Sequence, residues 1–186
     1  MTASPPVLAH THQMGPAVLA EIRAFLDTAF EGDFSDEDWD HTLGGVHAYV
    51  TDDAGILAHG SVVQRRVRYA GRSYRTGYVE GVAVRAGRRR EGLGGQVTAA
   101  LEGVLDRAYD LGALSASAAG APLYRARGWR AWPGRIAAQG PDGPVPLPHE
   151  EGSAYLRGTG GGPLPFPAGS AETGTLQFDW RDGDVL

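Results

Sequence analysis

Hydrophobic residues recur at helical spacing in two stretches of the chain. Residues 16–30 (PAVLAEIRAFLDTAF) place their large apolar side chains on one face, and Pro16 suits a first helical turn. Residues 96–110 repeat the pattern through Val97, Leu101 and Leu105. Both stretches predict amphipathic helices that bury one side. A shorter helix is predicted over 122–128 (PLYRARG), where Gly128 suits the C-terminal cap.

Strand-like segments fill most of the space between these helices. The runs 46–52 (VHAYVTD) and 56–70 (ILAHGSVVQRRVRYA) flank the turn signal DDAG and predict a hairpin. Further strands are expected within 73–86, 113–119 and 176–180. This order predicts an α/β (α+β) fold with a mixed, mostly antiparallel central sheet and flanking helices.

Proline is concentrated after Gly128, where eight of the twelve prolines lie between 133 and 167. That composition favours hairpin turns and irregular connections over a second core. A length of 186 residues suits one core, so a single domain over 1–186 is expected. Residues 1–14 are interpreted as a mobile N-terminus.

Composition excludes several kinds of chemistry. The chain has no cysteine and no lysine, so thiolate nucleophiles, Schiff-base amines and Walker-type phosphate loops are excluded. The six histidines show no metal-ligand spacing, so no metal site is expected. A net charge of −5 argues against nucleic-acid binding. Without an apolar membrane span or a signal peptide pattern, we expect a cytoplasmic protein with no membrane partner.

A glycine- and arginine-rich segment joins a predicted strand to the 96–110 helix. Glycines there allow close backbone approach, and the helix N-terminus favours an anionic group such as a pyrophosphate. From the residues alone, a tight turn without a ligand stays an equal alternative. The segment comprises Val82, Ala83 and Val84, followed by Arg89, Arg90, Glu91, Gly92, Leu93, Gly94 and Gly95.

The motif Arg-x-x-Gly-x-Gly at 89–94, after a V-x-V strand, resembles the GCN5-related N-acetyltransferase (GNAT) family. The resemblance implies acetyl-CoA as co-substrate and no metal. By the same resemblance, Val82–Val84 pair with the pantetheine arm, and the segment Arg89–Gly95 holds the pyrophosphate.

Longer stretches are similar to the aminoglycoside 2′-N-acetyltransferases within that family. The similarity implies transfer of an acetyl group to the 2′-amine of an aminoglycoside, by direct attack in a ternary complex, conferring resistance. It also implies a homodimer. The stretches are 32–48, 64–86, 109–118, 123–129 and 179–186.

Charge patterning agrees with a polycationic acceptor and a polyanionic donor. Nine of the 17 arginines fall between 65 and 90, and six of the 22 acidic residues fall within 31–40. Such clusters are more often solvated faces than binding pockets, so both interpretations stay open.

Two residues are candidates for proton transfer. Glu80, next to apolar Val79 and Gly81, suits a general base for an ammonium acceptor, and a structural ion pair is the alternative. Tyr124 reads as a core aromatic by periodicity, whereas the resemblance implies that it protonates the departing thiolate.

The acidic segments and the resemblance together predict which residues contact the acceptor substrate. The residues concerned are Asp33, Asp38, Glu80, Gly81, Ser115, His149, Glu150, Glu151, Asp184 and Leu186. Two alternatives to this function stay open: a GNAT enzyme that acetylates another small amine, and a non-catalytic protein that binds acyl-CoA or a drug.

Overall fold

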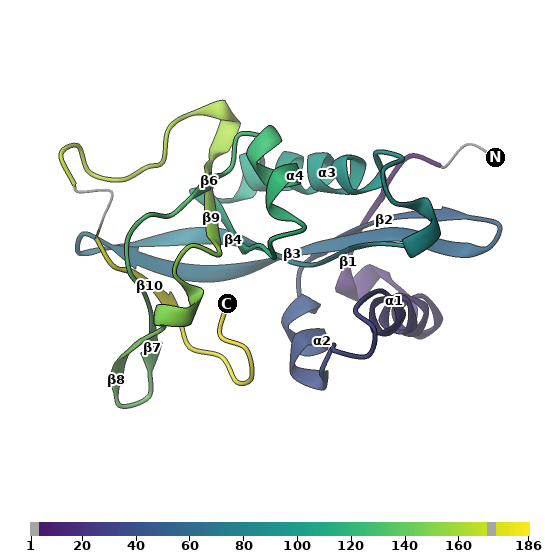
Figure 1. Cartoon of the computed structure of the whole chain (residues 1–186), viewed down its shortest axis with the longest axis horizontal. Helices are drawn as coiled ribbons and strands as arrows, with labels where there is room; N and C mark the ends of the chain where they lie inside the picture. The colour runs from purple at the N-terminus through teal and green to yellow at the C-terminus, as the bar shows by residue number, and fades with distance from the viewer. Residues whose placement is uncertain (1–3, 171–173) are drawn as a thin grey trace. The chain divides into compact units, whose positions relative to one another are not determined.

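A computed structural model describes residues 4–170 and 174–186 (Figure 1). Four α-helices lie in these ranges: α1 (Pro16–Ala29), α2 (Asp36–Thr42), α3 (Leu93–Ala108) and α4 (Ala121–Ala126). The ten strands are β1 (Val7–His10), β2 (Val46–Asp52), β3 (Gly55–Tyr69), β4 (Arg72–Val84), β5 (Leu111–Ser115), β6 (Arg130–Ala131), β7 (Ile136–Gly140), β8 (Gly143–Pro146), β9 (Ala154–Gly158) and β10 (Leu176–Asp179).

The elements group into two compact units. The first comprises the described residues up to Val63 together with Val79–Val104, and the second comprises Gln64–Tyr78 and the described residues from Leu105 onward. Strands β3 and β4 and helix α3 contribute residues to both units. A single domain over 1–186 stays a prediction.

The sheet of the first unit runs in the order β1-β2-β3-β4. Strands β1 and β2 are antiparallel, and β2 forms the expected antiparallel hairpin with β3. The expectation of a mobile N-terminus is wrong for residues 7–14. Val7–His10 gain backbone hydrogen bonds to β2, a 3₁₀ turn (Thr11–Gln13) follows, and Met14 is buried. Residues 1–3 of that prediction lie outside the described part of the chain.

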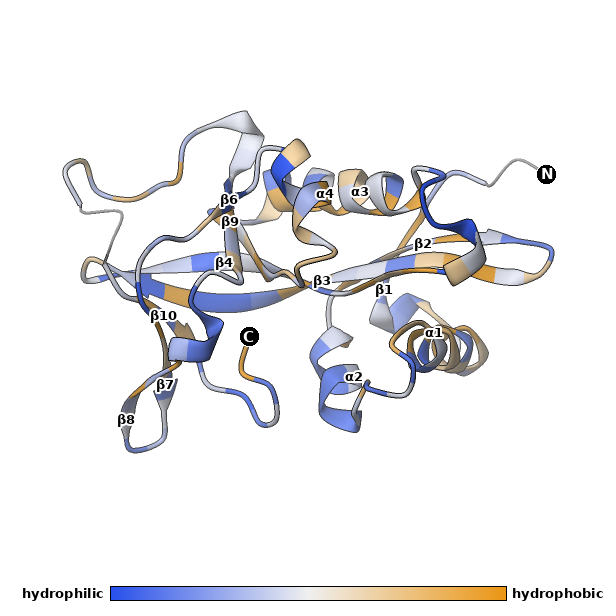
Figure 2. Ribbon diagram, viewed as in Figure 1, coloured by the Kyte–Doolittle hydropathy of each residue, from blue (hydrophilic) through white to orange (hydrophobic). Residues whose placement is uncertain are grey.

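Helix α1 supplies the core of the first unit, as its apolar spacing predicts. Ile22, Phe25 and Leu26 are buried against Ile56 of β3. Figure 2 shows hydrophobic and hydrophilic residues alternating around the turns of α1. The helix begins at Pro16, whose missing N–H costs nothing in a first turn.

Helix α3 packs closely on β3 within the first unit because Gly60 has no side chain. A Cβ at Gly60 would lie 3.0 Å from Leu101 Cδ1 and 3.1 Å from both Val82 Cγ2 and Val97 Cγ1. Glycine at this strand position therefore brings α3 and the end of β4 onto the same patch of sheet.

The sheet of the second unit runs in the order β6-β9-β5-β4-β3-β10-β7-β8. Strands β4 and β5 are parallel, as are β7 and β10, while β5–β9, β6–β9, β3–β10 and β7–β8 are antiparallel. The predicted mixed, mostly antiparallel sheet is confirmed. None of the helices described is long and apolar enough to cross a bilayer.

The proline-rich region contributes more structure than its composition predicts. The expected hairpin is present as β7 and β8, but β9 is an internal strand between β5 and β6. Ile136, Ala138, Tyr155 and Leu156 are buried. Strand β9 was not expected; it forms because the prolines lie mostly at strand ends and turns and leave the short apolar runs between them free to pair.

Candidate active site

The backbone of β4 turns sharply after Glu80. Val79 is buried, Glu80 is half-buried, and Gly81 adopts a left-handed conformation with φ of +54°. A Cβ at Gly81 would lie 3.1 Å from Thr42 Cγ2. Both the conformation and the crowding favour glycine, so a local irregularity separates the predicted base, Glu80, from the following segment Val82–Val84.

Two buried histidines stand behind this irregularity. His59 of β3 contacts the Gly81 carbonyl through Nδ1 at 2.9 Å, and its Nε2 lies 2.9 Å from His47 Nδ1. Burial lowers the pKa of His59 to about 3 and that of His47 to about 4. No pattern in the sequence indicates a common role for these two histidines, yet they contact each other in the folded protein. No group of three or more metal-ligating side chains occurs among the residues described.

Arg85 fastens the end of β4 to the β2–β3 hairpin. Its backbone N–H donates to the Leu57 carbonyl at 2.8 Å. One guanidinium nitrogen donates to the Ile56 carbonyl at 2.6 Å and to the Ala54 carbonyl at 3.2 Å. These bonds fix the point at which the chain leaves the strand and enters the glycine-rich loop.

The loop between β4 and α3 is held by a second arginine. Arg88 donates to Glu91 at 2.8 Å and to Asp52 at 3.0 Å, and the hydrogen bond to Glu91 is the main cause of its raised pKa. The Glu91 carboxylate therefore has a structural partner. Arg89 and Arg90 are exposed, which leaves two cations at the surface of the loop.

Helix α3 begins earlier than its apolar pattern predicts. Its first residue is Leu93, three positions before the expected start at 96, so Gly94 and Gly95 lie in its first turn. Leu93 is buried, and the free energy gained by burying its side chain offsets the low helix propensity of the two glycines. Gly92 precedes the helix with φ of +82° and open space around a Cβ. The first-turn N–H groups lack helical acceptors, as in any α-helix, and stand beside the loop arginines.

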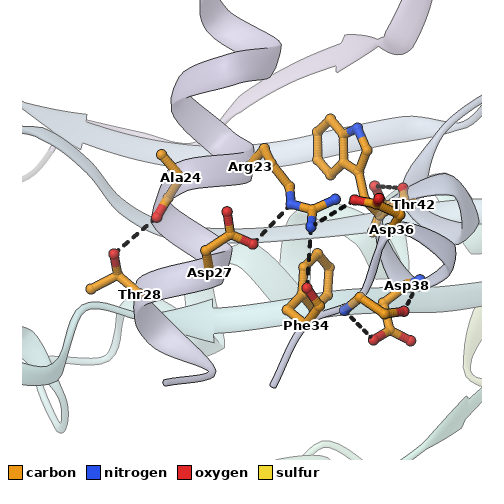
Figure 3. A network of polar contacts seen from close by, with 10 residues as sticks. Arg23, Ala24, Asp27, Thr28, Phe34, Asp36, Asp38 and Thr42 are labelled. Atoms are coloured by element: carbon orange, nitrogen blue, oxygen red, sulfur yellow. Dashed lines mark hydrogen bonds and ion pairs between the residues drawn. The ribbon is translucent and has the colours of Figure 1, made fainter. Parts of the chain in front are cut away.

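Arg23 of α1 contacts the acidic segment 31–40 of the first unit through Asp36 and the Phe34 carbonyl (Figure 3). Arg23 donates to Asp27 at 2.8 Å and forms an ion pair with Asp36 at 3.2 Å. Asp38 takes part in a capping box with Ser35 at the start of α2. Asp33 is exposed and makes no side-chain hydrogen bond or ion pair with any described residue.

Three residues predicted to contact the aminoglycoside lie close together in the second unit. The Ser115 hydroxyl donates to Ser153 Oγ at 3.1 Å, and the Ser153 hydroxyl lies within hydrogen-bond distance of the Glu150 carbonyl (2.8 Å) and of Glu150 Oε2 (2.9 Å). His149 Nε2 lies 3.6 Å from Glu150 Oε1. Glu151 follows in an exposed position. Ser153 was not predicted, because a serine in a glycine- and proline-rich stretch carries no distinguishing pattern.

Tyr124 is buried in α4, and its ring makes an edge contact with Trp129 at 6.0 Å between centroids. This packing is what a core aromatic would show, and the role implied by the resemblance stays a prediction. Gly128 follows the helix with φ of +85°, as expected for a C-terminal cap.

The last residues of the chain are tied to β3 of the same unit by Arg65, another residue not predicted. Arg65 is 3% exposed, and its guanidinium donates to Asp179 Oδ1 at 2.8 Å and to the Val185 carbonyl at 2.7 Å. Leu186 is buried, and its N–H donates to Asp184 Oδ1 at 3.3 Å. Asp184 and Leu186 therefore lie in a segment with a defined path.

Comparison with known proteins agrees with these features. Residues 11–132 match the acetyltransferase (GNAT) domain family. The chain belongs to the GNAT family. It is also 42% identical over 180 residues to an aminoglycoside 2′-N-acetyltransferase of Mycolicibacterium fortuitum, which covers 96% of this chain and 90% of that protein. The resemblance inferred from the sequence motifs is confirmed.

Solved structures share the fold at low sequence identity. The Escherichia coli GNAT family N-acetyltransferase YhbS, solved in complex with CoA, aligns with a TM-score of 0.62 and 18% identity, over 94% of this chain and 89% of that one. A probable N-acyltransferase of Enterococcus faecalis aligns with a TM-score of 0.56 and 17% identity over 69% of this chain, which spans only 33% of that protein.

Proposed function

We propose that this GNAT protein transfers the acetyl group of acetyl-CoA to the 2′-amine of aminoglycosides and thereby confers resistance to them. The observation that carries this proposal is the 42% identity to an aminoglycoside 2′-N-acetyltransferase over 96% of the chain. A match of that length includes both the glycine-rich loop and the segments that hold the predicted acceptor residues.

The donor site is proposed at the end of β4 and the start of α3. Val82–Val84 would pair with the pantetheine arm through their backbone. The loop Arg89–Gly95 would hold the pyrophosphate through its arginines and the first-turn N–H groups of α3. Two observations support this fit: Arg89 and Arg90 are exposed, and Gly92 leaves open space where a side chain would stand. When bound, acetyl-CoA supplies the acetyl group.

Proton transfer is assigned to two residues of this chain. Glu80 would accept the proton of the attacking ammonium group, directly or through a water molecule, and Tyr124 would donate a proton to the departing thiolate. The backbone N–H of Val82 would stabilise negative charge on the carbonyl oxygen. With both substrates bound together, much of the rate would come from their proximity.

The acceptor would be recognised by carboxylates and hydroxyls. In the second unit these are the linked residues Ser115 and Glu150 with His149, the exposed Glu151, and Asp184 with Leu186 in the segment fastened by Arg65. Asp33, Asp38 and Gly81 are proposed from the first unit. We further expect a cytoplasmic homodimer that handles small molecules rather than nucleic acid or membranes.

Thiol release from acetyl-CoA in the presence of different amines tests the function. We expect turnover with gentamicin and tobramycin and none with spermidine, a polycation without the aminoglycoside ring system. Turnover with spermidine but with neither aminoglycoside would identify an acetyltransferase for other amines. Aminoglycoside binding without thiol release would identify a binding protein and contradict the proposal.

A further inference from the structure

A continuous chain of hydrogen-bonding groups crosses the first unit from its surface to the Gly81 carbonyl. The Gly44 N–H donates to Thr11 Oγ1 at 2.9 Å, and Thr11 Oγ1 lies 3.0 Å from His47 Nε2. His47 Nδ1 lies 2.9 Å from His59 Nε2, and His59 Nδ1 lies 2.9 Å from the Gly81 oxygen. Both imidazoles are fully buried.

The Gly81 carbonyl, at one end of this series of hydrogen bonds, determines where the ring protons lie. A carbonyl only accepts, so His59 must carry its proton on Nδ1. In the neutral ring its Nε2 then accepts, which requires that His47 also carries its proton on Nδ1. The Thr11 hydroxyl has a single proton and two acceptors within reach, His47 Nε2 at 3.0 Å and the Gly45 carbonyl at 3.3 Å; donation to the nearer His47 Nε2 completes the arrangement. Both rings are held neutral by burial, so a single arrangement, with two Nδ1–H tautomers, satisfies all four ring nitrogens.

The series of hydrogen bonds ends at the peptide unit that joins Gly81 to Val82. No cis peptide bond occurs among the described residues, and in a trans peptide the C=O and N–H groups point in opposite directions. His59 holds the Gly81 oxygen, so the Val82 N–H points away from His59. A hydrogen bond accepted by the carbonyl also polarises the same amide and strengthens its N–H as a donor.

We propose that the His47–His59 pair positions the Gly81–Val82 peptide so that the Val82 N–H faces the carbonyl oxygen of the acetyl donor. This role rests on the proposed function, in which that N–H stabilises the developing oxyanion. His59 is a positioning residue that acts through the Gly81 carbonyl. His47 acts one step further back by fixing the His59 tautomer.

A glycine on one side of this peptide makes an additional restraint useful. Gly81 has no side chain to fix its orientation, and its left-handed conformation is one that glycine can leave readily. A rigid donor from the neighbouring strand provides the restraint that the backbone lacks. An apolar residue at position 59 would fill similar volume but would leave the Gly81 carbonyl without this partner.

Nitrogen-15 NMR of the histidine side chains tests the hydrogen-bond chain without reference to activity. We expect His47 and His59 to be neutral Nδ1–H tautomers at pH 7, assigned by comparing wild type with the His47→Gln and His59→Asn variants. An Nε2–H tautomer, or a charged ring, at either residue would overturn the proposal.

Kinetics of three variants test the positioning role. His59→Leu removes the donor, and we expect kcat to fall about 10- to 100-fold, less than the loss of an oxyanion donor itself, with little change in the KM for acetyl-CoA. His59→Asn keeps an N–H near the Nδ1 position and should restore most of kcat. His12→Leu, the same change at an exposed histidine of this unit, is the matched control.

The outcomes separate this inference from the proposed function. If wild type turns over aminoglycosides and a folded His59→Leu retains full kcat, the positioning role is wrong and the function stands. If wild type shows no turnover while both tautomers are found as expected, the proposed function fails and the catalytic role with it. If His59→Leu does not fold, two other results can still contradict the proposal. One is an Nε2–H tautomer or a charged ring at either histidine, and the other is a loss of kcat in His59→Asn.

Discussion

Glu80 and Gly81 are consecutive residues of β4 with different tasks. Glu80 presents a half-buried carboxylate, whereas Gly81 turns the backbone and gives its carbonyl to His59. The sequence indicates the first task, because an acidic residue between apolar neighbours stands out. The sequence does not indicate the second task. A glycine within a predicted strand reveals neither that its φ is positive nor which group bonds to its carbonyl.

Replacing Glu80 by glutamine tests its role as the base. We expect kcat to fall about 100-fold, at the lower end for loss of a general base, since part of the acceptor amine is already unprotonated near neutral pH. The KM for acetyl-CoA should stay nearly constant, and the acidic limb of the pH–rate profile should be lost. Asp142→Asn, which removes a carboxylate from the exposed β7–β8 turn, is the control. A wild-type profile for Glu80→Gln would leave Glu80 with a structural role only.

The buried histidines should make the free energy of unfolding depend on pH. Their pKa values are lowered from 6.5 to about 4 and about 3, so below pH 6.5 the unfolded chain binds protons that the folded chain excludes. The free energy of unfolding should therefore decrease as the pH is lowered from 6.5 to 4, by up to about 1.4 kcal/mol per pH unit for each histidine.

Urea unfolding at pH 7.5, 6 and 5 measures this slope. In His59→Asn the contribution of one histidine should disappear, whereas His12→Asn, at an exposed position, should keep the wild-type slope. The same slope in wild type and His59→Asn would show that His59 is not neutral in the folded state. The carboxylates with lowered pKa values, Asp106 and Asp110, lose their stabilising contribution mainly below about pH 5, so they contribute little between pH 7.5 and 5.

At the scale of elements, the strand β4, its loop and α3 form the part of the site that the sequence predicts best. The order strand, glycine-rich loop and helix is local, so it is visible in the sequence. The helix start was placed three residues late because two glycines conceal it, although Leu93 is buried in the first turn. The sequence does not indicate the role of Arg85 or the contact of Arg88 with Asp52, because Ala54 lies 31 residues before Arg85 and Asp52 lies 36 residues before Arg88.

Gly92→Val tests the loop as the donor site. We expect the KM for acetyl-CoA to rise well above any change in the aminoglycoside KM, because a branched side chain would obstruct the approach of phosphates to the loop N–H groups. Gly71→Val is a matched control, since Gly71 also has a positive φ (+75°) and open space around a Cβ. Equal losses for both substrates, or equal effects of both variants, would contradict the assignment.

At the scale of the whole chain, separation along the sequence decides what could be predicted. Helix α1, the β2–β3 hairpin and the fold class follow from local patterns. The contact of Arg65 with Asp179 joins residues 114 positions apart, and no local pattern indicates it. The His47–His59 contact depends on the register of a hairpin that contains an irregularity between Val50 and Thr51. Edge strand β1 was missed because four residues are too few for a periodic signal.

Salt should weaken aminoglycoside binding steeply, since a polycation is expected to bind through the carboxylates of a chain with net charge −5. Isothermal titration at increasing NaCl measures the effect. Asp33→Asn and Asp184→Asn should each weaken the drug more than acetyl-CoA, with Asp142→Asn as the control. A dissociation constant that does not change with salt would count against recognition by charge.

The most direct test of the central claim compares kanamycin B with kanamycin A, which differ only in an amine or a hydroxyl at the 2′ position. We predict acetyl-CoA-dependent turnover of kanamycin B, with the acetyl group located on the 2′-nitrogen by NMR of the product, and no turnover of kanamycin A. Equal acetylation of both compounds, or an acetyl group on another nitrogen of kanamycin B, would contradict the assignment.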